Sequence, residues 1–282
     1  MTVRRDYGLQ FALNITKSDL LHFGYWENDL SADFGTIRTA QERYVQEVLG
    51  RIPEGTRTIL EIGCGTGAVA TRLSGEGYEV ECVSPDALLN EKIAGEHPEL
   101  RLHCCKFENL STQKKYDLLL QMESCQYIRL ERGFRKFQEV LSPGGAILIS
   151  DTFRTSTTKD YKDWHTLDSF HKAVDKYGFK IDYSRNITLQ TAPTMDLTLK
   201  MYREYAVPIA RTLLTSLQDS VDRRKFYQVL WKLVRRFFRR RIERIGRDFY
   251  ETIPKLLDRH NYLQKVRYMI FVLKREQDAV AK

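Results

Sequence analysis

Residues 58–67 read Thr-Ile-Leu-Glu-Ile-Gly-Cys-Gly-Thr-Gly, and this stretch decides the fold. An apolar run of strand length leads directly into glycines at every second position. Such glycines let the chain turn tightly and leave bare backbone against which a ligand can lie. Small and apolar residues at helical spacing follow the loop. The sequence therefore predicts a strand, a ligand-binding loop and a helix in that order.

The same alternation continues on both sides of the loop, with short connections between the elements. It is typical of a doubly wound parallel sheet. We expect a Rossmann-like α/β fold with a seven-stranded, mostly parallel sheet and helices on both faces. Further strands are expected at 78–83, 100–105, 116–120, 146–150, 179–188 and 266–274. Helices are expected at 36–50, 134–141 and 167–177, a turn at 142–145, and mostly helix over 195–260.

These elements predict four segments. Residues 1–55 form an N-terminal lid and helix, and residues 56–190 form the cofactor-binding core. Residues 191–262 are a helical cap inserted before the last strand. Residues 263–282 supply that strand and a tail.

Composition narrows the class of protein. The chain has 282 residues with 42% hydrophobic and 29% charged, as ordinary globular proteins do. No apolar run approaches the roughly 20 residues of a membrane span. Arg4 and Arg5 have no apolar stretch behind them, so no signal peptide is expected. The expected compartment is the cytoplasm.

The five cysteines match no metal or haem spacing, so no metal site is expected. We expect them to be reduced, buried thiols. Cys104 and Cys105 are expected on one strand, pointing to opposite faces.

The glycine loop is compatible with two kinds of nucleotide ligand. The dinucleotide fingerprint is G-x-G-x-x-G, whereas this loop is G-x-G-x-G, and it lacks a P-loop lysine. Glu61 lies two residues before Gly63. A carboxylate there would oppose a pyrophosphate but suits a ligand carrying an ammonium or sulfonium. This favours S-adenosylmethionine over NAD.

The chain resembles the class I S-adenosylmethionine-dependent methyltransferases, and within them the small-molecule branch that includes tocopherol, sterol and natural-product methyltransferases. The resemblance covers residues 20–153 and returns at the last strand, but it is weak over 190–262. It rests on the loop 60–67, the strand 116–120 followed by Gln-Met-Glu-Ser, the turn 141–145, the strand ending at 149–151 and the aromatic segment 22–26.

The resemblance implies a binding role for several residues. Glu61 would face the amino group of the cofactor, and Tyr25 would close over the site. Ser84 and Pro85 would reach the ribose, and Gln121 would contribute from the fourth strand. The methionine part would lie against Gly63, Cys64, Gly65 and Gly67.

Two positions depart from the family pattern. Ser84 stands where an acidic residue usually binds the ribose, and a hydroxyl there makes one weaker contact. Lys106 stands where an aspartate often binds the adenine amino group. We therefore expect Lys106 to point outward, with Phe107 against the adenine ring and Glu108 as the acceptor.

Catalytic candidates are fewer, because methyl transfer from a sulfonium needs mainly alignment. Gln126 occupies the place of a histidine that small-molecule relatives often carry, and an amide cannot act as a base. Asp151, after the fifth strand, is predicted to be a base or a substrate-orienting acid; a loop-stabilising aspartate is the alternative. His165 is a second candidate, against a surface or core histidine. Tyr25 is predicted to contact cofactor or substrate, against simple packing.

The positive charge is concentrated in one segment. The net charge is +8, and residues 223–247 hold eleven Lys or Arg with one acid, Glu243. On a helical wheel residues 225–240 separate into a basic and an apolar face. Residues 225–247 could present a solvated face, bind an anionic membrane surface, or bind an acidic carrier or a phosphate-bearing substrate. Nucleic acid is the least favoured partner, because the Asn/Asp-Pro-Pro-aromatic motif of base-modifying enzymes is missing after the fourth strand.

The sequence thus predicts methyl transfer from S-adenosylmethionine to a small, apolar or amphiphilic acceptor, with carbon, oxygen and nitrogen acceptors left open. The alternatives are an RNA methyltransferase, and a non-catalytic cofactor-binding protein that binds a partner through its basic helix.

Overall fold

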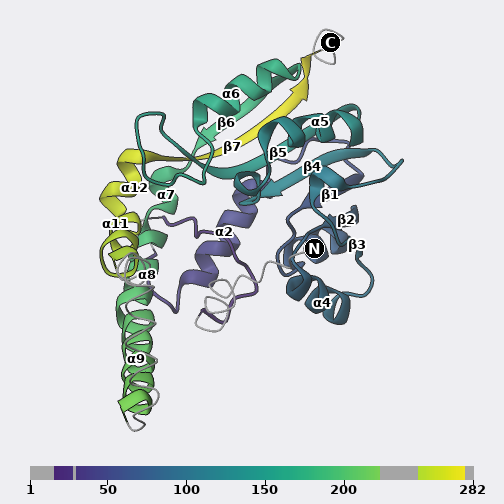
Figure 1. Ribbon diagram of the computed structural model, residues 1–282. Coiled ribbons are helices and arrows are strands. Elements are labelled where there is room, and N and C mark those ends of the chain that lie inside the picture. The colour runs from purple at the N-terminus through teal and green to yellow at the C-terminus, as the bar shows by residue number, and fades with distance from the viewer. Residues whose placement is uncertain (1–15, 28–29, 223–246, 277–282) are drawn as a thin grey trace. The chain divides into compact units, whose positions relative to one another are not determined.

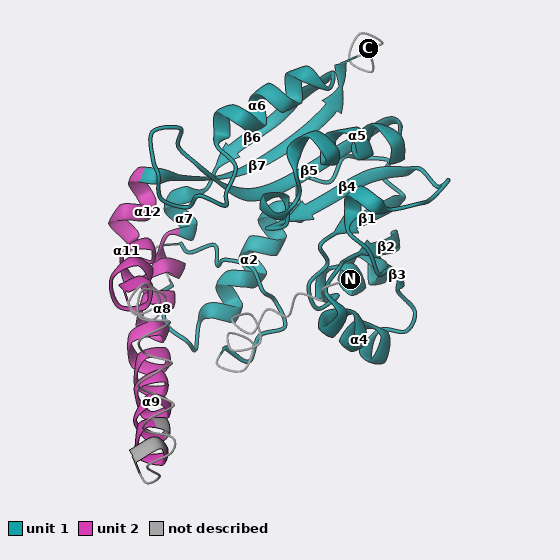
Figure 2. Cartoon of the chain, viewed as in Figure 1, with its two compact units in different colours: residues 1–191, 265–282 teal, residues 192–264 magenta. Residues whose placement is uncertain are grey.

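The computed structural model describes residues 16–27, 30–222 and 247–276 (Figure 1). The chain forms two compact units (Figure 2). Unit 1 comprises residues 1–191 and 265–282, and unit 2 comprises residues 192–264. Unit 2 is therefore an insertion within the sequence of unit 1.

Unit 1 is built on one seven-stranded sheet with the order β3-β2-β1-β4-β5-β7-β6. Strands β1 to β5 run parallel, and β7 runs antiparallel to both β5 and β6. The predicted seven-stranded, mostly parallel sheet is confirmed. The strands are β1 Thr58–Ile62, β2 Glu79–Val83, β3 Arg101–His103, β4 Tyr116–Met122, β5 Leu141–Arg154, β6 Phe179–Asn186 and β7 Val266–Arg275.

Helices cover both faces of this sheet (Figure 1). One face packs against α2 Ile37–Leu49, α3 Ala68–Gly75 and α4 Ala87–Glu96. The other packs against α5 Leu130–Val140 and α6 Leu167–Lys176. The run Leu118–Leu120 in β4 is fully buried because its side chains alternate between these two cores. Short helical turns lie at η1 Phe107–Asn109, η2 Cys125–Tyr127 and α7 Thr188–Thr191.

Unit 2 is helical in its described part. It contains α8 Pro193–Met201, α9 Val207–Asp222 and α11 Ile253–Leu256, with wider helical turns at 202–206 and 248–252, and α12 Arg259–Lys265 ends at its boundary. Residues 223–246 lie outside the described residues, and so does most of the predicted basic helix. Among the described helices, none combines the length and apolar character needed to cross a bilayer.

Three local expectations were wrong. Strand β3 ends at His103, so Cys104 and Cys105 lie beyond it, where Cys104 is exposed and Cys105 is only partly buried. The expected turn at 142–145 belongs to strand β5, because Leu141 already pairs with Tyr116 of β4. Strand β6 ends at Asn186, whose side chain accepts the backbone N–H of Thr188 where α7 begins.

Strand β5 also continues past Asp151 to Arg154, because β7 pairs with it along residues 146–154. Asp151 therefore does not end its strand. Pairing with β4 stops at Ser150, however, so Asp151 lies just beyond the edge of the parallel part of the sheet.

Candidate functional site

The glycine loop joins β1 to α3 at the carboxyl edge of the sheet, where the strand order reverses between β1 and β4. Gly63, Gly65 and Gly67 have φ values of 83°, 54° and 85°, a region that favours glycine. A Cβ atom at Gly63 would lie 2.5 Å from the Cβ of Ser124. This glycine is thus required both by its backbone conformation and by the close approach of the segment after β4.

The N-terminal segment lies against the same loop. Thr66 donates its hydroxyl to the carbonyl of Asp19 at 2.6 Å, and a Cβ at Gly65 would meet Leu21 at 3.3 Å. The cavity between loop and segment holds about 10 Å³, roughly the room of one water molecule. This cavity is too small for a ligand of nucleoside size.

Buried polar atoms without partners mark the site. Among the described residues, Glu61 Oε2 and both amide atoms of Gln121 are buried and make no hydrogen bond. Glu61 lies on β1 and Gln121 on the neighbouring β4, near the carboxyl ends of both strands. Burial raises the pKa of Glu61 to about 8, although a backbone hydrogen bond from Ala70 opposes the rise. A ligand cation beside Glu61 would relieve this penalty, so these residues fit an amino-acid-bearing cofactor.

The residues predicted to bind ribose and adenine follow the next two strands along the same edge. Ser84 is buried, and its hydroxyl accepts the backbone N–H of Asp86 at 3.2 Å, while Pro85 is exposed. Phe107 is buried with its ring 5.4 Å from that of Phe137. Glu108 is partly exposed. Lys106 is exposed, which agrees with the expectation that its side chain points outward.

Tyr25 does not line the cavity at the glycine loop. Its hydroxyl accepts a hydrogen bond from Arg185 of β6 at 2.8 Å, and Arg185 also pairs with Glu47 of α2. Strand β6 forms the edge of the sheet. Residues 19–22, rather than Tyr25, are the part of the N-terminal segment that faces the loop.

The two catalytic candidates Asp151 and His165 both hold the turn after β4. Asp151 is fully buried and accepts the backbone N–H groups of Gln126 at 3.3 Å and Thr152 at 2.7 Å. Burial raises the pKa of Asp151 to about 7. His165 Nε2 lies 2.9 Å from the carbonyl oxygen of Ile128, the distance of an N–H···O bond in the tautomer that carries the proton there. The structure therefore brings the two residues to one turn.

A polar cluster that the sequence did not reveal lies beside the loop; we call it the Glu123 cluster. Tyr268 of β7 donates its hydroxyl to Glu123 Oε1 at 2.7 Å, and the Tyr268 and Tyr44 hydroxyls are 2.9 Å apart. Tyr44 of α2 in turn donates to Ser150 Oγ at 2.8 Å. The ring of His22 lies 5.4 Å from that of Tyr44. The cluster comprises Glu123, Tyr268, Tyr44, Ser150 and His22.

Glu123 itself is held in an unusual state. Its φ is 58°, which costs a non-glycine residue about 1 kcal/mol or more. Burial raises the pKa of Glu123 to about 8 and lowers the pKa of His22 to about 4. Such strain and such perturbed acids concentrate at functional sites. The one signal in the sequence was an acid directly after the most apolar strand.

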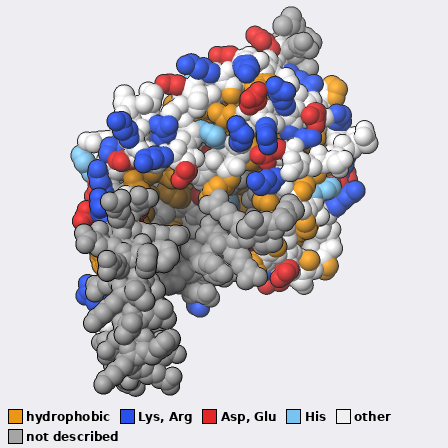
Figure 3. Space-filling view, in the orientation of Figure 1, with side chains coloured by type: hydrophobic (Ala, Val, Ile, Leu, Met, Phe, Trp, Pro, Cys, Tyr) orange, Lys and Arg blue, Asp and Glu red, His pale blue; other side chains and the backbone are white. Residues whose placement is uncertain are grey.

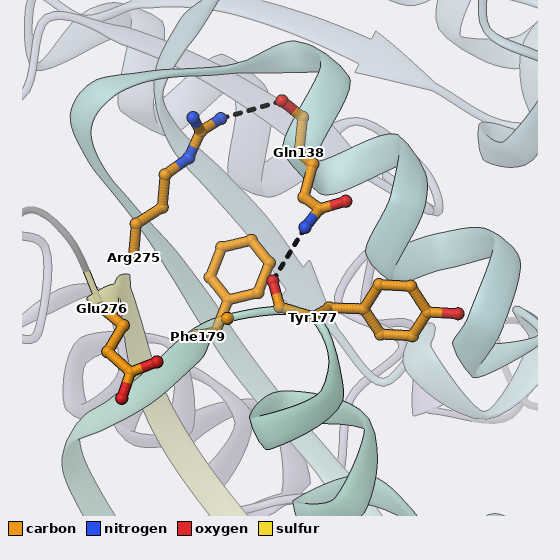
Figure 4. A pocket seen from close by; sticks show the side chains of 6 residues that line it. Gln138, Tyr177, Phe179, Arg275 and Glu276 are labelled. Atoms are coloured by element: carbon orange, nitrogen blue, oxygen red, sulfur yellow. Dashed lines mark hydrogen bonds between the residues drawn. The ribbon is translucent and has the colours of Figure 1, made fainter.

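A roomier cavity of about 240 Å³ lies at the opposite end of the sheet (Figure 4). Arg275 of β7 borders it and donates to the carbonyl groups of Gln138 and Leu141. Figure 4 shows the phenol of Tyr177 pointing away from Arg275. The cavity lies at the start of β5, away from the carboxyl edge where α/β sheets bind ligands. Among the described residues, no group of three or more His, Cys, Asp or Glu side chains is placed to hold a metal ion.

On the face drawn in Figure 3, Lys and Arg side chains are interspersed with Asp and Glu. Ion pairs among the described residues include Lys114 with Glu79 and Lys274 with Asp182. This view of the described residues offers no continuous basic surface of the kind that nucleic-acid phosphates require.

Comparison with known proteins agrees with the geometry. A family model described as "Methyltransferase domain" matches residues 36–183. The malonyl-[acyl-carrier protein] O-methyltransferase 2 of Ilyobacter polytropus is 30% identical over 154 residues, which are 51% of this chain and 56% of that protein. An S-adenosyl-L-methionine-dependent Diels-Alderase of Neonectria sp. is 25% identical over 159 residues, 55% of this chain and 63% of that protein.

A solved structure shares the fold over most of the chain. Geranyl diphosphate C-methyltransferase from Streptomyces coelicolor superposes with a TM-score of 0.64 at 13% identity, covering 90% of this chain and 91% of that one. The matches to the two curated relatives span only a little more than half of the length of those proteins. The expected class I methyltransferase fold is confirmed.

Proposed function

The chain belongs to the family of methyltransferase domains, and on this premise we propose that the protein transfers a methyl group from S-adenosylmethionine to a small acceptor. One observation carries the proposal most directly: a glycine loop with three positive φ values lies beside a buried, unpartnered glutamate oxygen. Bare backbone and a carboxylate together suit a ligand that carries an amino acid moiety.

In this proposal the chain's own residues bind and orient the cofactor. S-adenosylmethionine, when bound, supplies a methyl carbon activated by a sulfonium. Glu61 accepts hydrogen bonds from the cofactor's ammonium group, and Gln121 supplies both a donor and an acceptor from β4. The backbone of the loop 63–67 lies along the methionine part.

The remaining predicted contacts stay part of the proposal. Ser84 and Pro85 border the ribose. Phe107 and Glu108 border the adenine ring, with Phe107 held rigid by Phe137. Tyr25 is proposed to influence the cofactor site without direct contact, because its hydroxyl is hydrogen-bonded to Arg185.

We assign Asp151 an orienting role. Both of its oxygens accept backbone N–H groups and its side chain is fully buried, which favours holding the turn 125–128 over direct proton removal. His165 contacts the same turn at the carbonyl oxygen of Ile128. A fixed turn matters because displacements of about 1 Å can cost methyl transfer a hundredfold.

The acceptor is proposed to be small and apolar or amphiphilic. The partly exposed rings of His22 and Phe23 lie against the buried tyrosines of the Glu123 cluster, with Phe23 and Tyr268 5.6 Å apart. The relatives' names include acceptors as different as a malonyl group on a carrier protein and geranyl diphosphate. They do not decide between carbon, oxygen and nitrogen.

The basic segment 225–247 is proposed to bind an anionic membrane surface. Each Lys or Arg near such a surface contributes about 1 kcal/mol, and the attraction is screened by salt. In unit 2, α9 also exposes Ile209, Leu213 and Leu214. Sedimentation with anionic vesicles should retain the native chain at low salt. A variant with Arg235, Arg236 and Arg239 changed to Glu should stay in solution, and equal behaviour of both proteins would refute the proposal.

Calorimetry tests the function itself. The native chain should bind S-adenosylmethionine and not NAD, and it should release S-adenosylhomocysteine when supplied with a lipid extract. Turnover with RNA but not with the extract would favour the RNA methyltransferase alternative. Binding of S-adenosylmethionine without turnover on either the lipid extract or RNA would favour the alternative of a non-catalytic cofactor-binding protein.

A further inference from the structure

A carboxyl group stands at the edge of the proposed cofactor site. Glu123 directly follows β4, and the next residue, Ser124, is the one that packs against Gly63 of the glycine loop. His22 lines the cavity at that loop, and its neighbour Phe23 donates its backbone N–H to Glu123 at 2.6 Å. Glu123 is therefore linked to the glycine loop in two ways, through its neighbour Ser124 and through the segment that contains His22 and Phe23.

The two oxygens of this carboxyl group differ. Oε1 accepts two hydrogen bonds, from the Phe23 N–H at 2.6 Å and from the Tyr268 hydroxyl at 2.7 Å. Both hydrogen bonds found for this carboxyl group among the described residues go to Oε1, and the side chain is partly exposed. One oxygen is thus held in place while the other can meet a ligand.

Groups from four elements surround Glu123. Tyr268 of β7 and the backbone N–H of Phe23 in the N-terminal segment donate to its carboxyl group, Asp151 of β5 acts on it electrostatically, and Tyr44 of α2 lies next to Tyr268. The carboxyl of Asp151 opposes ionisation of Glu123, whereas the hydrogen bonds from Tyr268 and Phe23 favour it. Burial is the largest influence and raises the pKa of Glu123 to about 8. A base is most effective when its pKa lies near the operating pH.

We propose that Glu123 is the proton acceptor of the methyl transfer, and that the acceptor group is a weakly acidic hydroxyl such as a phenol or an enol. The inference rests on the proposed function. In this step the acceptor O–H bond breaks and its proton passes to Oε2 of Glu123. The acceptor oxygen forms a bond to the methyl carbon, and the breaking carbon–sulfur bond leaves its electron pair on sulfur as a neutral thioether.

The surroundings of Glu123 favour this class of acceptor. In the ionised form that accepts the proton, Glu123 would repel an acceptor that is itself a carboxylate. The rings of His22 and Phe23 are partly exposed and pack against the buried rings of Tyr44 at 5.4 Å and Tyr268 at 5.6 Å, so they offer apolar surface for a flat, conjugated molecule. A hydroxyl with a pKa near 10 can give its proton to a base of this strength at a small energetic cost.

Tyr268 and Tyr44 are positioning residues in this arrangement. Their hydroxyl chain ends on Ser150 of β5, so it ties Glu123 to α2, β5 and β7 at once. Such a chain keeps Oε1 occupied and fixes the carboxyl group in place. The left-handed φ of Glu123 is a second constraint with the same effect.

Two phenols of different acidity test the role of Glu123. At pH 8 phenol is almost entirely un-ionised and needs a base, whereas 4-nitrophenol is largely ionised and does not. Glu123→Gln keeps the shape and the acceptor at Oε1. It should lower methyl transfer to phenol by about a hundredfold or more, yet change transfer to 4-nitrophenol less than about threefold. The exposed Glu54→Gln is the matched control and should change neither rate.

Infrared titration gives a readout without turnover. Both proteins carry Glu61→Gln, and one of them also carries Glu123→Gln. The difference between their spectra should contain the band of a protonated carboxyl group, which disappears as the pH rises, with a midpoint near pH 8. The Glu61 substitution is needed because that group titrates in the same range. Tyr268→Phe should move the midpoint upward, since the lost hydrogen bond favoured the ionised form.

The outcomes separate this inference from the proposed function. Equal losses on both phenols, or a midpoint in the ordinary range of glutamate, would overturn the role of Glu123. A native chain that binds S-adenosylmethionine in calorimetry but methylates neither phenol would overturn the acceptor class. A native chain that does not bind S-adenosylmethionine would instead refute the proposed function.

Discussion

Cofactor binding should depend on pH through Glu61. The carboxyl group is buried, lacks a partner on Oε2, and has its pKa raised to about 8. Only the ionised form can pair with the ammonium of the cofactor, and pairing lowers the pKa of Glu61 again. Binding therefore releases a proton at neutral pH, and affinity rises with pH until the free carboxyl is ionised.

The magnitude follows from the ionised fraction of Glu61. With a pKa of about 8, that fraction is about 1% at pH 6 and about 9% at pH 7. Affinity should therefore rise about ninefold over this unit, or about 1.3 kcal/mol. The α-amino group of the ligand stays largely protonated up to about pH 7, so it does not mask the rise. Above about pH 8 its own deprotonation should weaken binding.

Calorimetry in two buffers of different ionisation enthalpy counts the released protons. At pH 7 we expect about 0.9 proton per bound cofactor, since that fraction of Glu61 is protonated beforehand. Glu61→Gln should bind more weakly at pH 7 and lose the slope, whereas the exposed Glu54→Gln should keep both. A flat affinity in the native chain, or a native slope in Glu61→Gln, would refute the reasoning.

Glu61 also makes a prediction about the stability of the ligand-free protein. Its folded-state pKa is raised above the ordinary value, so the folded state binds the extra proton. The contribution of Glu61 to stability is therefore lost as pH rises from about 4.5 toward 8. Glu61→Gln should raise the melting temperature more at pH 8 than at pH 5, and an equal gain at both would contradict the raised pKa.

Four further substitutions test the remaining assignments. Gly65→Arg should abolish binding of S-adenosylmethionine, because the φ of Gly65 is 54° and a Cβ there would lie 3.3 Å from Leu21. Circular dichroism should show the fold largely intact. Undiminished binding would mean that the cofactor site lies elsewhere. Phe107→Leu should weaken cofactor affinity more than Lys106→Ala, since Phe107 is buried and Lys106 exposed; the reverse order would invert the adenine assignment. Asp151→Asn should cut turnover by about a hundredfold with little change in cofactor affinity, and unchanged turnover would return Asp151 to a purely structural role.

Much of the fold could be predicted from local patterns. The alternation of apolar strands and helices depends on neighbours in sequence, and it places the loop 63–67 between β1 and α3 without further information. Glycine spacing reports directly on backbone conformation, and all three loop glycines have positive φ. A ligand-binding role for Glu61 could likewise be predicted, because the residue lies two positions before the first loop glycine in the sequence.

Element ends were less predictable, because they depend on pairing partners. The sequence 142–145 has every mark of a turn, yet it continues β5 because Leu141 pairs with Tyr116. In the same way β7, far along the chain, extends β5 past Asp151. Backbone hydrogen bonds to a distant strand outweigh the local preference of Pro and Gly for turns.

What the sequence by itself determined is the kind of fold and the place of the loop, since both are encoded at short range. Only the tertiary structure decided which side chains share the site. Tyr268 and Tyr44 are 224 residues apart, and their hydroxyl chain to Glu123 exists because β7 enters the sheet beside β5. It likewise placed Tyr25 on Arg185 of β6 and put His22 at the loop. Burial, and with it the raised pKa of Glu123, is a property of the packed chain and has no counterpart in any local stretch of sequence.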